Sequence, residues 1–350
     1  MFGPARSVDL LGRPGYLECM MLDLYDTRCK VWSLIGQSDV SPREFSGLLS
    51  RFHTLDNILS ANCELLIEEL ELDEERAVDI STACDGLSRA ADFFEAVNSR
   101  KIKTVTMFDE NYPERFHELN DPPPLIFYRG KLPTKEERIV TIVGTSAPSA
   151  EGIAVAVDFG AQMASRGVSL LSGLARGIDA AALVGATGSS GAPGPFGATE
   201  ATEAAVPGDK NGKPGPQGRR NAAPVYAAAT SGLEYIYPDE NSSLARQVGE
   251  RGAVFSEYSP DQDFELEHVG PANRLCVALS QAVVIGEIFS DSDGARDVAE
   301  FCVDVGKLLF VLVPTEQPIA DEKALENLLA MGAIGVRYPD EIDSIVRCLV

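Results

Sequence analysis

The sequence predicts an α/β protein, in which a mainly parallel β-sheet follows a small helical domain. Residues 1–100 carry apolar side chains at helical spacing, whereas from residue 139 short apolar runs alternate with helical patterns. A chain of 350 residues, 45% of them hydrophobic, is long and apolar enough for roughly two globular domains. We therefore expect residues 1–100 to form one domain and residues 101–350 the other.

Two segments of the first domain, at 42–58 and 62–86, place an apolar residue every three or four positions. Consecutive short helices of this kind are typical of SAM-like or helical-hairpin modules, which often bind duplex nucleic acid. Between residues 64 and 75, however, seven side chains are acidic and would repel phosphates. A solvated structural face is therefore the favoured interpretation of this segment.

The second domain has the pattern of βαβ units, because buried-strand runs alternate with helical segments of moderate length. A rigid Asp121–Pro124 segment separates the first two of these strands. The expected strands are 103–107, 125–129, 139–143, 168–171, 225–227, 252–256, 282–285 and 308–313, and the expected helices are 153–165, 178–185, 242–250, 273–279, 294–305 and 321–329.

One segment does not fit the alternation of strands and helices. Residues 188–224 contain eight glycines and six prolines among 37 residues, a low-complexity composition. We expect a disordered surface insertion between a helix and the next strand. Its four basic residues could touch a polyanion, but a solvated linker is the favoured interpretation.

The charge balance limits the possible partners. The chain has 53 acidic and 30 basic residues, a net charge of −23 at pH 7. This excludes a uniformly basic nucleic-acid clamp and a polybasic membrane anchor, but not a local basic groove. No stretch reaches the ~18–20 apolar residues that span a bilayer, and no signal peptide is evident. Seven cysteines without a CxxC pair indicate no zinc ribbon and no disulfide framework, so we expect reduced thiols and a cytoplasmic protein.

The loops that follow the strands hold the candidate binding residues, because α/β sheets bind ligands at the carboxyl ends of their strands. Gly144 to Ser149 follows one strand and precedes a helix, whose N-terminus favours an anion. Ser172 to Asp179 follows the next strand and contains two glycines and Arg176. This second loop predicts either a phosphate-binding site or a tight turn in which Arg176 pairs with Asp179.

Conventional catalytic motifs are poorly represented. There are three histidines, and no HExxH, GxSxG, Walker A or zinc-ligand spacing occurs. Glu257 and Glu287 could form an acid/base pair, but nothing in the sequence brings them together. We expect neither catalytic residues nor a metal or cofactor.

Seven segments in this order and spacing resemble the DNA-processing protein A family, also called Smf. The resemblance covers roughly residues 30–340, apart from the 188–224 insertion. Each segment is weak alone, but together they are specific. They are Tyr112–Phe116, Asp121–Gly130 (DPPPLIFYRG), Ile142–Gly144, Leu171–Asp179 (LSGLARGID), Ser231–Asn241 (SGLEYIYPDEN), Ser256–Tyr258 and Asn273–Arg274.

The resemblance implies an extended Rossmann-like sheet and a non-catalytic protein that binds single-stranded DNA without sequence preference. It also implies a role in DNA uptake, natural transformation and recombination, in which a homodimer loads a RecA-type recombinase onto incoming DNA. The expected DNA- or phosphate-binding residues are Gly144, Ser149, Gly173, Arg176, Gly177, Asn273 and Arg274.

Several positions depart from the family pattern. The usual Gly-Ser-Arg is Gly144-Thr145-Ser146 here, and the usual Phe-Pro-x-Arg-Asn-Arg begins at Val269 and has Ala272 in place of its first arginine. Each lost phosphate contact would weaken binding and flatten its salt dependence. The other departures are Leu183 for a histidine, Asp293 for a glycine and Asp297 for a threonine.

Two other functions stay open at the level of sequence. A Rossmann-like protein of the phosphoribohydrolase-like group would bind a nucleotide or small molecule, and Gly294 and Glu300 lie near the place where such enzymes carry their motif. A scaffold that has lost its DNA site would account for the departures from the family pattern.

Overall fold

The computed structural model describes residue 22 and residues 25–188, 223–289, 293–314 and 321–349. These divide into two compact units. Unit 1 holds the described residues up to Tyr112 together with His117–Ile126, and unit 2 holds Pro113–Phe116 and the described residues from Phe127 onward. Residues 101–112 therefore group with the helices that precede them.

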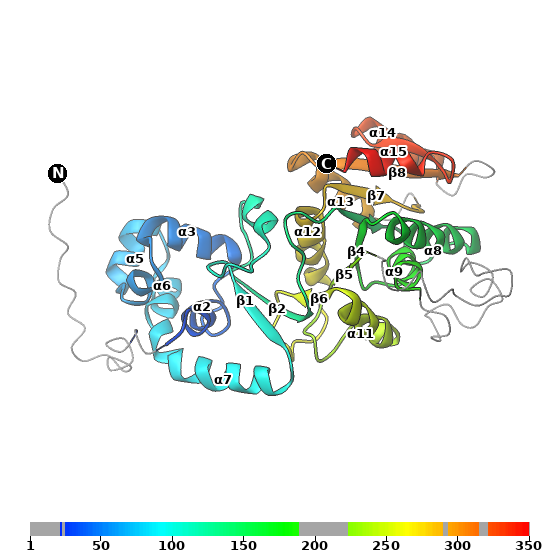
Figure 1. The fold of residues 1–350 in the computed structure, drawn as a ribbon. Coiled ribbons are helices and arrows are strands. Elements are labelled where there is room, and N and C mark those ends of the chain that lie inside the picture. Colours follow the sequence, from blue (N-terminus) through cyan, green and yellow to red (C-terminus); the bar gives the residue numbers. More distant parts are fainter. Residues whose placement is uncertain (1–21, 23–24, 189–222, 290–292, 315–320, 350) are drawn as a thin grey trace. The chain divides into compact units, whose positions relative to one another are not determined.

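Unit 1 is a helical unit followed by one short strand (Figure 1). Helix α3 begins with a capping box, in which Ser41 and Glu44 satisfy each other's backbone N–H groups. Its apolar face buries Phe45 and Leu48. The elements are α2 (Thr27–Ile35), α3 (Pro42–Phe52), α4 (Leu55–Leu59), α5 (Cys63–Leu70), α6 (Glu74–Ser81), η2 (Ala83–Gly86), α7 (Leu87–Ser99) and β1 (Lys103–Thr106).

Arg76 connects helix α6 to helix α3 and to the loop that precedes α3. The Arg76 guanidinium donates to Glu44 Oε1 at 2.8 Å and to the carbonyl oxygens of Ser38 and Asp39, also at 2.8 Å. Burial alone would raise the pKa of Glu44, but hydrogen bonds from Arg76 and Ser41 lower it to about 2. This ion pair links α3 to α6.

Unit 2 contains the α/β sheet that the sequence predicts. Its strands lie in the order β2-β6-β5-β4-β3-β7-β8-β9; β2 is antiparallel to β6, and all the other pairs are parallel. The strands are β2 (Leu125–Gly130), β3 (Ile139–Val143), β4 (Ser169–Gly173), β5 (Val225–Ala228), β6 (Ala253–Ser256), β7 (Ala282–Ile285), β8 (Leu308–Pro314) and β9 (Ile334–Tyr338).

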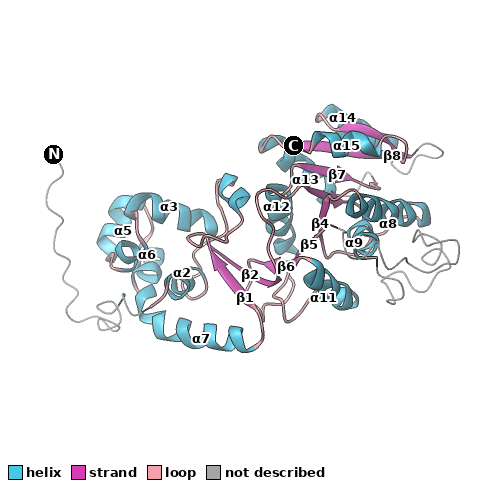
Figure 2. Cartoon of the chain, in the orientation of Figure 1, coloured by secondary structure: helices cyan, strands magenta, loops and turns pink. Residues whose placement is uncertain are grey.

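Helices cover both faces of this sheet, which is why its central strands are buried along their whole length. Helices α8, α9 and α11 pack together on one face, whereas α12 and α13 lie on the other (Figures 1 and 2). The helices are η3 (Glu114–Glu118), α8 (Ala150–Ser165), α9 (Ile178–Thr187), η4 (Asp239–Asn241), α11 (Ser242–Arg251), η5 (Leu266–His268), α12 (Val269–Leu279), α13 (Asp293–Asp304), α14 (Glu322–Ala330) and α15 (Ile342–Cys348).

The fold class is confirmed, and two expectations change. Strand β9 and helix α15 follow the last expected helix, although the sequence patterns did not indicate them. Among the described cysteines, Cys29, Cys63, Cys276, Cys302 and Cys348 are free, but Cys84 is disulfide-bonded, so the expectation of reduced thiols is wrong there.

Helix α9 ends at Thr187 and β5 begins at Val225, and the expected disordered insertion at 188–224 lies almost entirely outside the described residues. One side chain contacts both flanks of this segment, and the Ala223 N–H also donates to the Ala164 carbonyl at 3.2 Å. Arg251 at the end of α11 donates to the Ala186 carbonyl at 2.8 Å and to the Ala223 carbonyl at 3.4 Å.

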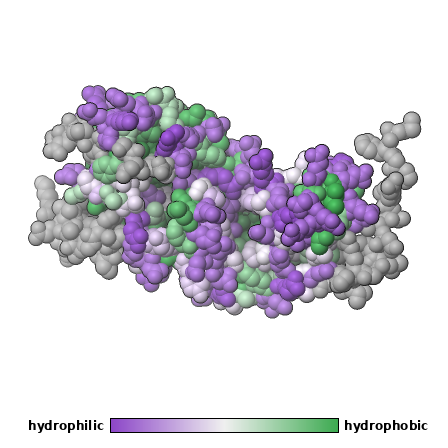
Figure 3. Space-filling model, turned by 180° about the vertical axis from the view of Figure 1, so that it is seen from behind, coloured by the Kyte–Doolittle hydropathy of each residue, from purple (hydrophilic) through white to green (hydrophobic). Residues whose placement is uncertain are grey.

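The surface in Figure 3 is mostly hydrophilic, with apolar side chains in separate patches. This distribution agrees with the excess of acidic residues. In the described part of the chain, we find no helix with the length and hydropathy needed to cross a membrane.

Candidate functional site

The sheet reverses its winding direction between β3 and β7. From β3 the chain proceeds through α8 to β4 on one side, and from β7 through α13 to β8 on the other. Such a switch point leaves a crevice at the carboxyl ends of the strands, where doubly wound folds bind ligands. The loops after β3, β4, β5, β6 and β7 together form what we call the carboxyl edge.

A carboxylate of the protein itself fills this switch-point crevice. Glu287, which follows β7, is 4% exposed and accepts a hydrogen bond from the Ser149 N–H at 2.6 Å. Ser149 caps helix α8, since its hydroxyl oxygen accepts from the Gly152 N–H at 2.9 Å. A Cβ atom on Gly152 would lie 2.4 Å from Glu287 Oε2. The helix N-terminus that the sequence predicts as an anion site therefore already holds an anion.

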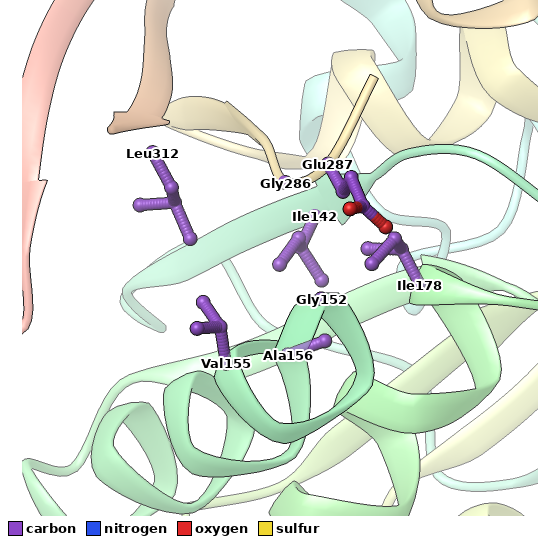
Figure 4. A pocket seen from close by; sticks show the side chains of 8 residues that line it. All are labelled: Ile142, Gly152, Val155, Ala156, Ile178, Gly286, Glu287 and Leu312. Carbon is purple, nitrogen blue, oxygen red and sulfur yellow. The ribbon is translucent and has the colours of Figure 1, made fainter. Parts of the chain in front are cut away.

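Little free space remains at this point. Figure 4 shows the Glu287 carboxylate beside Ile178 and the start of α8, with apolar side chains around the rest of the pocket. The free volume is about 10 Å³, which is at the lower limit for a single water molecule. The pocket is lined by Ile142, Gly152, Val155, Ala156, Ile178, Gly286, Glu287 and Leu312.

The three glycines predicted for the site serve close packing between loops. Gly177 has a φ of +82°, and a Cβ there would lie 2.1 Å from the Thr145 carbonyl oxygen. A Cβ on Gly144 would meet Ile178 at 2.7 Å, and one on Gly173 would meet Asp179 Oδ2 at 2.7 Å. These contacts hold the loops after β3 and β4 against each other.

The Asp179 carboxyl lies beside the Gly144 and Gly173 N–H groups, which the sequence predicts as donors to a phosphate. Its side chain is buried, and desolvation raises its pKa to about 7, although the neighbouring Ser172 side chain and the Gly173 and Gly144 backbone N–H groups oppose the shift. The Ser172 hydroxyl itself donates to the Ile142 carbonyl at 2.5 Å. Asp179 is therefore a structural acid, and the alternative in which it pairs with Arg176 is wrong.

Arg176 instead lies at the surface of the same edge. Its side chain is 48% exposed and forms two hydrogen bonds to Glu240, at 2.5 Å and 3.2 Å. The guanidinium carbon lies 5.7 Å from the centroid of the Tyr237 ring. Asn241 holds this arrangement, because its amide donates to the Leu174 carbonyl at 2.7 Å. Of the two predicted arginines, this is the accessible one.

Arg274 has a different environment. It lies on α12 and donates to Glu257 Oε2 at 2.8 Å, and the two side chains are only 12% and 10% exposed. Asn273, its neighbour on the helix, is half-buried. Glu257 and Glu287 thus have separate partners, so the structure gives no support to an acid/base pair.

Among the described residues, no group of three or more His, Cys, Asp or Glu side chains could hold a metal.

An aromatic pair that the sequence patterns do not indicate lies beside Arg176. The Tyr237 and Phe264 rings stack with centroids 3.9 Å apart and planes 11° apart. They come from the loops after β5 and β6, which are joined by a 2.8 Å hydrogen bond from the Gly232 N–H to the Gln262 carbonyl. We call Arg176, Tyr237 and Phe264 the arginine–aromatic cluster. Only the fold brings these three residues together, because they lie on separate loops.

Comparison with known proteins identifies the family. A model of the family described as DNA recombination-mediator protein A matches residues 103–194 and 218–347. Protein Smf of Synechocystis is 25% identical over 306 residues, which are 86% of this chain and 68% of that protein. DNA processing protein DprA of Streptococcus pneumoniae is 26% identical over 213 residues, 61% of this chain and 64% of that protein. The chain thus spans about two thirds of the length of these relatives.

Solved structures share the fold. DprA from Streptococcus pneumoniae superposes with a TM-score of 0.68 at 20% identity, covering 91% of this chain and 98% of that one. DprA from Helicobacter pylori, a structure described for its single-stranded DNA binding mode, gives a TM-score of 0.53 at 22% identity, covering 71% and 98%. Because the family model matches residues 103–194 and 218–347, which are more than half of the chain, the chain belongs to the DNA recombination-mediator protein A family.

Proposed function

We propose that this protein binds single-stranded DNA through the carboxyl edge of its sheet and acts as a non-catalytic mediator of recombination. The observation that carries the proposal is the family match across both halves of the sheet. The relatives named DNA processing protein and the Helicobacter pylori structure described for its DNA binding agree with it. We further propose that it acts in DNA uptake and natural transformation in the cytoplasm, as a homodimer that loads a RecA-type recombinase onto the strand.

The group that would bind a DNA phosphate is the exposed Arg176 guanidinium at the carboxyl edge. Arg176 is the predicted cation with an exposed guanidinium, and its partner Glu240 is itself 35% exposed. An exposed ion pair of this kind contributes only about 0–1 kcal/mol. A DNA phosphate can therefore replace Glu240 on Arg176 at a small energetic cost.

The other predicted residues support the site from within. We propose that Gly144, Gly173 and Gly177 fix the shape of the loops, that Ser149 caps α8, and that Arg274 holds the loop after β6 through Glu257. In this assignment Asn273, in the middle of α12, stays a candidate contact. The filled crevice counts against nucleotide binding at the switch point, because a free volume of about 10 Å³ cannot hold a nucleobase or a phosphate there.

The experiment is equilibrium binding of a labelled oligo-dT, followed by fluorescence anisotropy across a salt series. We expect affinity to fall with salt, and Arg176→Ala to lower it and to make the slope of log K against log salt shallower by about 0.7. Arg337→Ala is the matched control, since Arg337 is also an exposed arginine paired with a glutamate, Glu341, but on β9. Absence of binding by the folded protein at low salt would overturn the proposal.

A further inference from the structure

The arginine–aromatic cluster has a geometry that a structural role alone does not require. Tyr237 is 38% exposed and Phe264 is partly exposed, yet their rings are stacked face to face. Aromatic pairs usually gain their stability by burying both rings, whereas an exposed ring pair leaves apolar area in contact with water. The neighbouring side chains Tyr235 and Leu266 are also exposed, at 56% and 80%.

The backbone around these rings is well held. The Glu234 N–H donates to the Pro260 carbonyl at 2.9 Å, close in sequence to both rings. Further along the two loops, His268 Nδ1 lies 3.0 Å from the Thr230 carbonyl and its ring stacks on Tyr258. The rings therefore stand on a fixed base, which reduces the entropy lost when a flat ligand stacks on them.

The cation is placed at one end of the stack. Arg176 lies against Tyr237, and Tyr237 lies against Phe264, so that a charged group and two rings follow one another along the surface. Sites for single-stranded nucleic acid combine these elements, since a cation meets the phosphate and an aromatic ring meets the base. Every base has a flat π-face, so that such a site is tolerant of sequence.

We propose that a nucleobase of the bound strand stacks on the face of Phe264 that Tyr237 leaves uncovered, while Arg176 holds a phosphate of the same strand. Tyr237 supports the ring from behind. This inference rests on the proposed function and adds a base-binding contact to it, with Phe264 as the residue in contact with the base.

The test compares two labelled oligonucleotides of equal length and charge, oligo-dT and the same backbone with abasic sites in place of bases. Wild type is expected to bind oligo-dT about fivefold or more tightly than the abasic strand. Phe264→Leu should abolish this preference, leave the affinity for the abasic strand unchanged and leave the salt slope unchanged. Phe264→Trp should restore the preference.

Phe108→Leu is the matched control, because Phe108 is an exposed ring in unit 1, and it should change neither affinity. Equal, salt-dependent binding of both strands by wild type would overturn base stacking and leave the proposed function intact. An equal loss on both strands in Phe264→Leu would assign the ring a structural role and would also overturn the inference. Absence of binding to either strand would overturn both proposals.

Discussion

The two halves of the carboxyl edge treat charge in opposite ways. Between β3 and β7, the backbone donors point at buried carboxylates of the protein itself, Glu287 and Asp179. In the loops after β4, β5 and β6, Arg176 and Tyr237 are exposed and Phe264 is partly exposed. The half between β3 and β7 therefore uses its polar groups to hold the loops together. The half formed by the loops after β4, β5 and β6 keeps its cation and rings available to a ligand. The same fold thus separates the stability of the site from its binding surface.

The largest expected effect concerns Asp179. Its pKa is about 7 in the folded protein, against an ordinary value of 3.8, so the folded protein retains a proton that the unfolded chain has lost between pH 4 and 7. This contribution to the free energy of unfolding is complete below pH 4 and is lost as the pH rises through 7. Asn cannot titrate, so the free energy of unfolding of Asp179→Asn lacks this loss. Relative to wild type, it should therefore rise by on the order of 4 kcal/mol between pH 4 and 8. Urea denaturation at a series of pH values measures the difference, and parallel curves for the two proteins would contradict it.

The next effect tests whether Arg274 belongs to the structural half. Arg274→Ala leaves Glu257 buried without its ion-pair partner, which should lower the free energy of unfolding by about 3 kcal/mol. Arg296→Ala, which removes an exposed pair with Glu300, is the control and should change it by less than about 1 kcal/mol. Chemical denaturation followed by circular dichroism distinguishes the two. A stable Arg274→Ala protein with weakened DNA binding would instead make Arg274 a direct phosphate contact.

The variant Glu287→Gln tests whether the carboxylate in the switch-point crevice is structural. Glu287→Gln keeps the size of the side chain but removes the negative charge from the N-terminus of α8, which should lower the free energy of unfolding by about 2 kcal/mol. Oligo-dT affinity should not change, because the crevice is not part of the proposed binding surface. An increase in DNA affinity would show that this carboxylate competes with phosphate and would remove the distinction between the two halves.

The smallest effect lies in the exposed half. Glu240→Gln removes the internal carboxylate from Arg176 and should raise oligo-dT affinity about three- to fivefold, in line with the ~1 kcal/mol of an exposed ion pair. Anisotropy at low salt measures it, with Glu341→Gln at the start of α15, which removes the carboxylate paired with Arg337, as the control. An unchanged affinity would indicate that phosphate does not meet Arg176.

Local sequence patterns predicted most of the fold because buried strands are continuous apolar runs. Strand β9 escaped detection for the opposite reason. In Ile334–Tyr338, only Val336 and Tyr338 are buried, as suits a strand at the end of the sheet order. An edge strand of this kind lacks the apolar run that marks the central strands.

The candidate site was less predictable, because its contacts join distant positions. Arg176 and Glu240 are 64 residues apart, and Ser149 and Glu287 are 138 residues apart. No spacing rule identifies such partners. The aromatic side chains illustrate the same point. Val269 stands where the family pattern has a phenylalanine, whereas the Phe264 ring, from the preceding loop, lies against Tyr237.

The bridge made by Arg251 has a practical consequence. One guanidinium contacts the carbonyl groups of Ala186 at the end of α9 and of Ala223 before β5, so the chain leaves α9 and returns to the sheet beside the same side chain. The family match also stops at residue 194 and resumes at 218. Because Ala186 and Ala223 contact the same side chain, the two ends that any connecting segment must join lie close together. We therefore predict that a short linker, a fluorescent label or an affinity handle can join these two residues in place of the native segment, and that the folded protein keeps its free energy of unfolding.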